Sequence, residues 1–260
     1  MRLPEDASSQ PVFGLLQQVS DFYEHLSFGI MGFRVGPLAG MFNFDSYLMD
    51  SIGATVLSIR QVLLSGKVAD AYMLLRKYDD SIVINAYENV LFLQAEDKGE
   101  IVEQRIDDWV NGKSPLPAYK EMNKAVLGYP GLQVINDLLS SEKRYARIRK
   151  RCNDFCHANY FAYMQLNSDI VYPNFTKLLE QFRGDMVCLA AMHFSQLFTL
   201  RPFYMSSSDY IDALEAGMTP EPDSQHLVAP FMQKYFDDIV KRYYPGIAQE
   251  MISSTYMKLA

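Results

Sequence analysis

Side chains that could carry out chemistry are concentrated between Lys143 and Tyr160. Lysine or arginine occupies six of the nine positions from Lys143 to Arg151, in a chain whose formal net charge is -7. Asn153, Asp154 and His157 follow directly. An imidazole with a pKa near neutral, placed beside cations and amides, suits proton transfer at a phosphodiester. RNA supplies its own nucleophile, the 2′-hydroxyl, so a cleaving site needs only a proton carrier and positive charge.

These residue types suggest a division of roles in an RNA-cleaving site. His157 would move the proton, Arg151 would stabilise charge on the phosphate, and Asn153 would orient the reacting groups. Because Arg151 and His157 are six positions apart, they point about 120° away from each other on a straight helix. Their convergence therefore requires a kink or a symmetric dimer. The residues expected to bind the RNA backbone are Lys143, Arg144, Arg147 and Lys150.

Other interpretations of the same stretch remain open. A run of charges is commonly a solvated helix face, although Lys143 and Arg144 are unfavourable at a helix N-terminus and so indicate another purpose. Cys152, Cys156 and His157 could contribute to a metal site, but such a site needs a fourth ligand and no second cysteine pair lies nearby. We therefore expect no metal. Without a Gly-rich phosphate loop, we also expect no nucleotide cofactor.

The composition indicates a globular, cytoplasmic chain. Its 260 residues, 49% apolar and 21% charged, are sufficient for a large core. The negative net charge argues against a protein that coats nucleic acid or anionic membrane indiscriminately, but it permits a local basic site. Three cysteines without framework spacing indicate a reducing compartment, and no signal segment is visible. The longest apolar stretch, about 186–200, is too short and polar to span a membrane.

Apolar side chains recur at helical spacing along most of the chain, and no segment shows the sustained alternation of a strand. Ser65-Gly66-Lys67 is expected to end one helix and lead directly into a second, antiparallel helix through Leu93. Residues 29–40 hold four glycines and are expected to form a loop. The clearest apolar stripe comprises Leu48, Ile52, Val56, Ile59 and Leu63. Further helices are expected over 11–26, 100–110, 119–127, 131–139, 143–160, 173–200, 209–216 and 227–259, the last interrupted at Pro245-Gly246.

The segment Arg151-Cys152-Asn153-Asp154-Phe155-Cys156-His157 resembles the signature of the HEPN superfamily, in which four to six residues separate an Arg from a His on a late helix of a bundle. The resemblance covers about residues 45–200. It implies an up-and-down helical bundle that dimerises through the motif helices, and a metal-independent endoribonuclease of a defence or toxin system. Arg151 and His157 would be its catalytic pair, with Asn153 as the nearest match to the polar residue. Asp79 or Asp80 would match an acidic residue of an early helix.

The sequence thus predicts an all-α protein, an up-and-down HEPN-like bundle with additional N- and C-terminal helices. The expected divisions are an N-terminal arm, helix and loop over 1–42, the bundle over 43–202, and a C-terminal helical extension over 203–260. The predicted function is RNA binding and cleavage at the groove of a homodimer. The alternative is a non-catalytic HEPN-like interaction module, in which the motif serves packing or partner binding.

Overall fold

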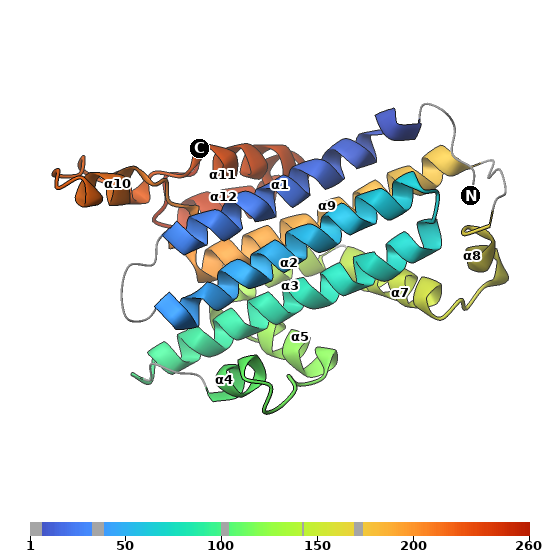
Figure 1. Ribbon diagram of the computed structural model, residues 1–260, viewed down its shortest axis with the longest axis horizontal. Helices are drawn as coiled ribbons and strands as arrows, with labels where there is room; N and C mark the ends of the chain where they lie inside the picture. Colours follow the sequence, from blue (N-terminus) through green and yellow to red (C-terminus); the bar gives the residue numbers. More distant parts are fainter. Residues whose placement is uncertain (1–6, 33–38, 100–103, 142, 169–173) are drawn as a thin grey trace. The chain divides into compact units, whose positions relative to one another are not determined.

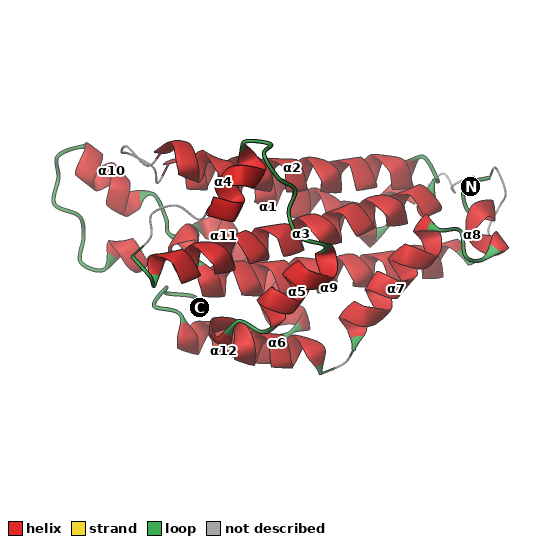
Figure 2. Cartoon of the chain, turned by 90° about the horizontal axis from the view of Figure 1, so that it is seen from below, coloured by secondary structure: helices red, strands yellow, loops and turns green. Residues whose placement is uncertain are grey.

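The computed structural model describes residues 7–32, 39–99, 104–141, 143–168 and 174–260. Within these ranges the chain forms helices joined by turns, and the only β-type pairing is an isolated antiparallel bridge between Ser206 and Val228 (Figure 2). This confirms the all-α class. The chain divides into two compact units, one from 1–79 and 142–191 and the other from 80–141 and 192–260. The division expected at 42 and 202 stays a prediction.

The first unit begins with two helices in extensive contact, α1 (Pro11–Gly32) and α2 (Ala39–Leu64). They approach closely at Gly53, where an added Cβ would lie 3.1 Å from the Cβ of Tyr23. The Ser20 hydroxyl donates to the Gly53 carbonyl at 3.1 Å, which satisfies a polar group inside this contact. A side chain at position 53 would therefore force the two helices apart.

The predicted hairpin of α2 and α3 (Val68–Glu96) is confirmed (Figure 1). Gly66 takes a left-handed conformation with φ of 74°, and the Lys67 amide donates to the Val62 carbonyl at 3.1 Å. This bond satisfies one of the carbonyls that have no partner at the C-terminal end of a helix. The last four members of the predicted apolar stripe, Ile52, Val56, Ile59 and Leu63, are buried.

The loop expected over 29–40 is wrong at its start, because α1 continues through Gly32. Gly29 lies in open space and Ile30 is fully buried. A glycine inside a helix costs about 1 kcal/mol relative to alanine, and burial of an isoleucine side chain stabilises by about 1.5–3 kcal/mol. Packing therefore outweighs the local preference. The predicted loop is also wrong at its end, because α2 begins at Ala39, and residues 33–38 lie outside the described residues.

Helices α3 and α9 (Phe175–Leu200) are joined by hydrogen bonds within each unit, between Tyr72 and Asp185 in the first and between Asn85 and His193 in the second. Each contributes its first part to the first unit and its second part to the second unit. The first unit is completed by α7 (Arg144–Cys156) and α8 (Phe161–Gln165). Across the described residues, none of the helices is both long and apolar enough to cross a membrane.

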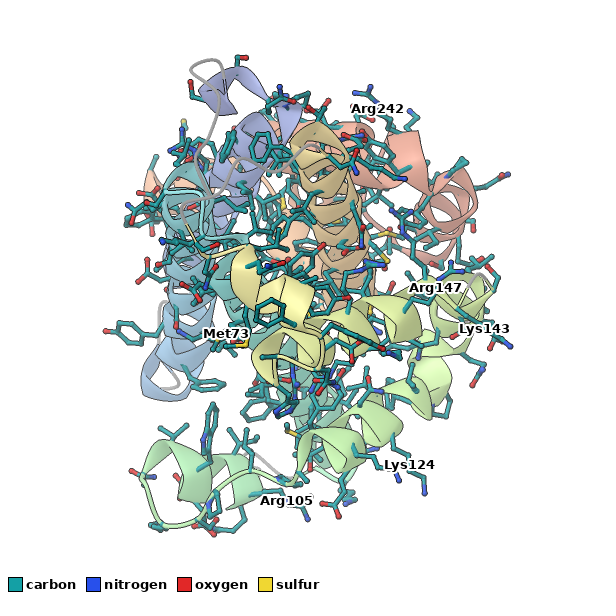
Figure 3. All side chains as sticks on the ribbon, turned by 90° about the vertical axis from the view of Figure 1, so that its right-hand side faces the viewer. Met73, Arg105, Lys124, Lys143, Arg147 and Arg242 are labelled. Carbon is teal, nitrogen blue, oxygen red and sulfur yellow. The ribbon has the colours of Figure 1, made fainter. Side chains whose placement is uncertain are left out.

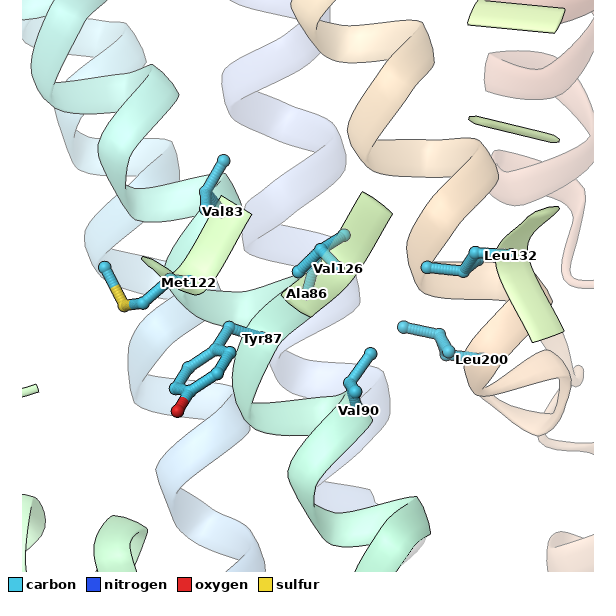
Figure 4. Close-up of a cluster of buried hydrophobic side chains, with 8 residues drawn as sticks. All are labelled: Val83, Ala86, Tyr87, Val90, Met122, Val126, Leu132 and Leu200. Atoms are coloured by element: carbon cyan, nitrogen blue, oxygen red, sulfur yellow. The ribbon is translucent and has the colours of Figure 1, made fainter. Parts of the chain in front are cut away.

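The second unit contains several shorter helices. A cluster of buried apolar residues joins α3, α5 and α9 through residues such as Tyr87, Val126 and Leu200 (Figure 4). The predicted interruption at Pro245 is confirmed, since a helix begins there. A π-helix over Phe236–Lys241 precedes it. The other helices are α4 (Gln104–Val110), α5 (Tyr119–Leu127), α6 (Gln133–Ser140), α10 (Asp209–Glu215), α11 (Pro230–Tyr235) and α12 (Pro245–Ser254).

A polar network is buried beside this apolar cluster. Asn85 and Asn89 both donate to Oε1 of the fully buried Glu88, at 2.8 and 2.9 Å. His193 Nε2 bonds Oδ1 of Asn85 at 2.8 Å, and Arg201 Nε donates to Oδ1 of Asn89 at 2.9 Å. Because an amide oxygen only accepts, the His193 proton lies on Nε2. Burial lowers the pKa of His193 to about 3, so its imidazole is neutral.

Candidate functional site

The predicted site residues lie on α7 or directly at its ends. They are distributed over four sides of this helix. Its inner side is apolar: Ile148, Cys152 and Phe155 are buried. One turn of helix contains 3.6 residues, so the positions between these three project to the flanks and to the outside. The run of basic residues is therefore distributed over surfaces with different surroundings.

The flank of α7 that faces α9 is held by two arginines. Arg144 Nη2 donates to the carbonyl of Gly184 at 2.9 Å. An added Cβ at Gly184 would lie 2.8 Å from this nitrogen, so the absence of a side chain lets Arg144 reach the backbone. Arg151 pairs with the buried carboxylate of Asp185, which also accepts from the Tyr72 hydroxyl at 3.2 Å. Arg151 thus has an ionic partner within its own chain.

Burial dominates the electrostatics around Asp185. Loss of hydration raises the pKa of its carboxyl, and the bonds from Arg151 and Tyr72 oppose this shift. Burial also raises the pKa of Tyr72 well above its ordinary value, so its hydroxyl keeps its proton and donates. The same cause raises the pKa of the Cys152 thiol, which makes it a poor nucleophile and a poor metal ligand.

The opposite flank of α7 faces α3. Arg149 forms an ion pair with Asp79, whose side chain is almost completely buried, and the Tyr145 hydroxyl donates to the other Asp79 oxygen at 3.0 Å. Arg76 donates to the side-chain oxygen of Asn153. Asn153, the predicted orienting residue, therefore bonds a residue of α3.

The outside of α7 presents what we call the outer stripe. Figure 3 shows two of its members, Lys143 and Arg147, at the outer side of the helix. Lys150 donates to Asp154 at 2.7 Å, and Asn159 donates to the same carboxylate at 2.8 Å. The stripe follows steps of four and three residues and consists of Lys143, Arg147, Lys150, Asp154 and His157.

The structure does not bring the three predicted catalytic residues together within the described part of one chain. Arg151 lies on the α9 flank, Asn153 on the α3 flank, and His157 is exposed at the C-terminal end of α7. The helix is continuous from Arg144 to Cys156, and His157 lies directly beyond its C-terminal end. The catalytic assignment thus depends entirely on a second subunit and stays a prediction.

The structure adds a group of residues that the sequence had not singled out. Tyr160, Phe161 and Met164 follow α7 directly and are 55, 73 and 60% exposed. We call them the aromatic corner. The signal in the sequence was an aromatic and methionine-rich segment, 160–164, immediately after a strongly polar helix.

A column of stacked rings supports the aromatic corner from inside. Tyr72 stacks on Phe155 with ring centroids 4.2 Å apart, and Phe155 stacks on Tyr163 at 4.1 Å. Tyr160 meets Tyr163 edge to face at 5.3 Å. Because these contacts reach from the core to the surface, the position of the corner is fixed by packing.

The structure gives no support to the metal hypothesis. Cys152 and Cys156 lie toward the inner side of α7, whereas His157 is exposed at the end of the outer stripe. Among the described residues, no group of three or more His, Cys, Asp or Glu side chains could hold a metal ion.

No family model matches the chain, and the searches of curated proteins and of solved structures find no match either. The HEPN resemblance therefore remains an expectation from residues 151–157 and their helical context.

Proposed function

We propose that the protein binds RNA through the outer stripe of α7 and the aromatic corner, without cleaving it as a single chain. The observation that carries this proposal is the continuity of these two surfaces. From Lys143 to His157 the stripe extends about 20 Å at 1.5 Å per residue. It leads directly to Tyr160 and Phe161 at the exposed corner.

This arrangement combines the two interactions by which proteins bind RNA with little sequence preference. Cations such as Lys143 and Arg147 neutralise phosphates, and exposed aromatic rings stack on bases. The negative net charge of the whole chain weakens long-range attraction to RNA. The proposed binding is therefore local and strongly dependent on salt.

The bond between Arg151 and Asp185 supports binding without cleavage. A guanidinium paired with a buried carboxylate has its charge offset and part of its donor set occupied. Cleavage at a dimer groove would require the remaining donors of Arg151 to reach the phosphate. It would also require His157 from a second subunit. The proposal keeps the RNA binding of the leading prediction and, like the alternative, assigns no catalysis to a single chain.

The test is RNA binding by the full chain as a function of salt. Replacing two stripe cations, Arg147→Ala with Lys150→Ala, should reduce the slope of log affinity against log salt by about 1.4, because each phosphate contact on a single strand contributes about 0.7. The matched control is Lys120→Ala with Lys124→Ala, which removes the same charge from exposed positions on α5. It should leave the slope nearly unchanged.

Cleavage is tested separately with total RNA in EDTA, comparing the wild-type chain with His157→Ala. We expect intact RNA in both samples. Cleavage by the wild-type chain that His157→Ala abolishes would contradict the non-catalytic proposal. Equal RNA affinity in the stripe and control variants, or no binding at low salt, would refute the proposed binding surface.

A further inference from the structure

A projecting segment of the second unit, residues 208–223, is held at its base and exposed along its length. We call it the acidic arm. At its base, the Ser207 amide donates to the Leu227 carbonyl at 2.8 Å, and the Ala229 amide donates to the Met205 carbonyl at 2.9 Å. These bonds flank the antiparallel bridge described above. Figure 1 shows α10, the helix of this arm, beyond the ends of α11 and α12.

The arm is helical although it buries none of its helical residues. Helix α10 has seven residues and no buried side chain. Its C-terminal end is closed by Gly217 at φ of 67°, with the Met218 amide donating to the Ala213 carbonyl at 2.9 Å. An isolated helix shorter than about 12–15 residues is marginal in water. Local end bonds therefore keep α10 ordered while its side chains remain available to a partner.

The exposed side chains of the arm combine apolar and acidic character. Leu214 is 50% exposed and Met218 is 62% exposed. Between 208 and 223 the chain has no lysine or arginine. Its five acidic residues, all exposed, are Asp209, Asp212, Glu215, Glu221 and Asp223. A surface of this kind is complementary to one that pairs exposed cations with exposed apolar groups.

The outer stripe and aromatic corner form such a surface on the same chain. The stripe provides Lys143, Arg147 and Lys150, and the corner provides rings and a methionine next to them. We propose that the acidic arm of one copy docks on the outer stripe and aromatic corner of a second copy. Acidic side chains of the arm meet the cations of the stripe, and Leu214 and Met218 contact the rings.

This contact joins two different surfaces, so it is heterologous rather than isologous. It closes into a finite assembly only when the contacts are reciprocal or form a ring. The inference does not rest on RNA binding, because the arm would dock whether or not the stripe also binds RNA. If both are true, the arm and RNA compete for the same cations.

The test is self-association of the nuclease-treated full chain, followed by sedimentation velocity over a range of protein concentrations. We expect association at low salt that weakens as salt rises, since the Debye length falls from about 10 Å at 0.1 M to about 3 Å at 1 M. An arm variant, Asp212→Lys with Glu215→Lys, and a stripe variant, Arg147→Glu with Lys150→Glu, should each weaken association at least about tenfold.

The decisive sample is an equimolar mixture of the two variants. In the mixture, each reversed surface meets an opposite charge on the other protein, so association should return. Recovery also shows that both variants are folded. The matched control is Lys120→Glu with Lys124→Glu on α5, which changes the net charge by the same amount as the stripe variant. It should associate like the wild-type chain. The proposal would be overturned if the wild-type chain is monomeric at every concentration tested. It would also be overturned if either variant associates as strongly as the wild-type chain, or if association does not return in the mixture.

Discussion

Replacing Asp79 by alanine should weaken the packing of α7 against α3 and strongly destabilise the first unit. Asp79 is the shared acceptor for Arg149 and for the Tyr145 hydroxyl. The side chain of Asp79 is 1% exposed and that of Arg149 is 13% exposed. The substitution therefore removes the carboxylate that the largely buried Arg149 guanidinium and the Tyr145 hydroxyl share.

The expected loss follows from these burial values. Removing one member of a buried ion pair costs about 3–5 kcal/mol. Arg149 can reach some water, which favours the lower end of this range. A lost hydrogen bond from Tyr145 adds about 1 kcal/mol. We expect Asp79→Ala to lower the free energy of unfolding by about 3–4 kcal/mol, and a matched change at the exposed Asp50, in α2, to alter it by less than about 0.5 kcal/mol.

A double-mutant cycle separates the ion pair from simple packing. The cycle compares Asp79→Leu, Arg149→Met and their double variant, which removes both charges and should cost less than Asp79→Leu alone. The assay is urea unfolding followed by circular dichroism, with hydrogen exchange of the α7 amides as a local measurement. Additive single and double effects, or equal effects at Asp79 and Asp50, would refute the assigned role of this pair.

Other predictions concern the buried histidine and two glycines. His193 has a folded-state pKa of about 3, below its ordinary 6.5, so its contribution to stability is complete above pH 6.5. As the pH falls below 6.5, the free energy of unfolding decreases by about 1.4 kcal/mol per pH unit. His193→Gln should remove this part of the pH dependence in urea titrations, and an unchanged profile would contradict it. Gly66→Ala should cost about 1–2 kcal/mol because Gly66 is left-handed, whereas Gly14→Ala, in open space within α1, should stabilise by about 0.5–1 kcal/mol. Thermal unfolding measures whether the two substitutions change stability in opposite directions. An equal loss of stability in both variants would contradict this prediction.

Local patterns were sufficient to predict the helices that bury one face. The apolar stripe that includes Ile52 and Val56 is buried as expected, and Gly66 ends its helix in the expected conformation. Both features depend on residues within a few turns of one another. The all-α class follows from such patterns because helical hydrogen bonds are local.

The basic run shows where local patterns stop being informative. Nothing in residues 143–157 indicates which cations turn inward, because the partner of Arg149 is 70 residues away and that of Arg151 is 34 residues away. The unfavourable position of Arg144 at the start of α7 did signal another purpose, and its bond to Gly184 supplies one. The π-helix over 236–241 was also not predicted, since apolar spacing does not reveal a change in hydrogen-bond register.

Within the second unit, a buried polar network fixes the axial register of α3 against α9. Its members are Asn85, Glu88, Asn89, His193 and Arg201. Sliding one helix by a single turn would move each partner by about 5.4 Å, beyond hydrogen-bond reach. An apolar contact tolerates such a shift more readily because it has no direction. These five positions therefore behave as one combination, so the effect of an exchange at any of them depends on which residues occupy the others.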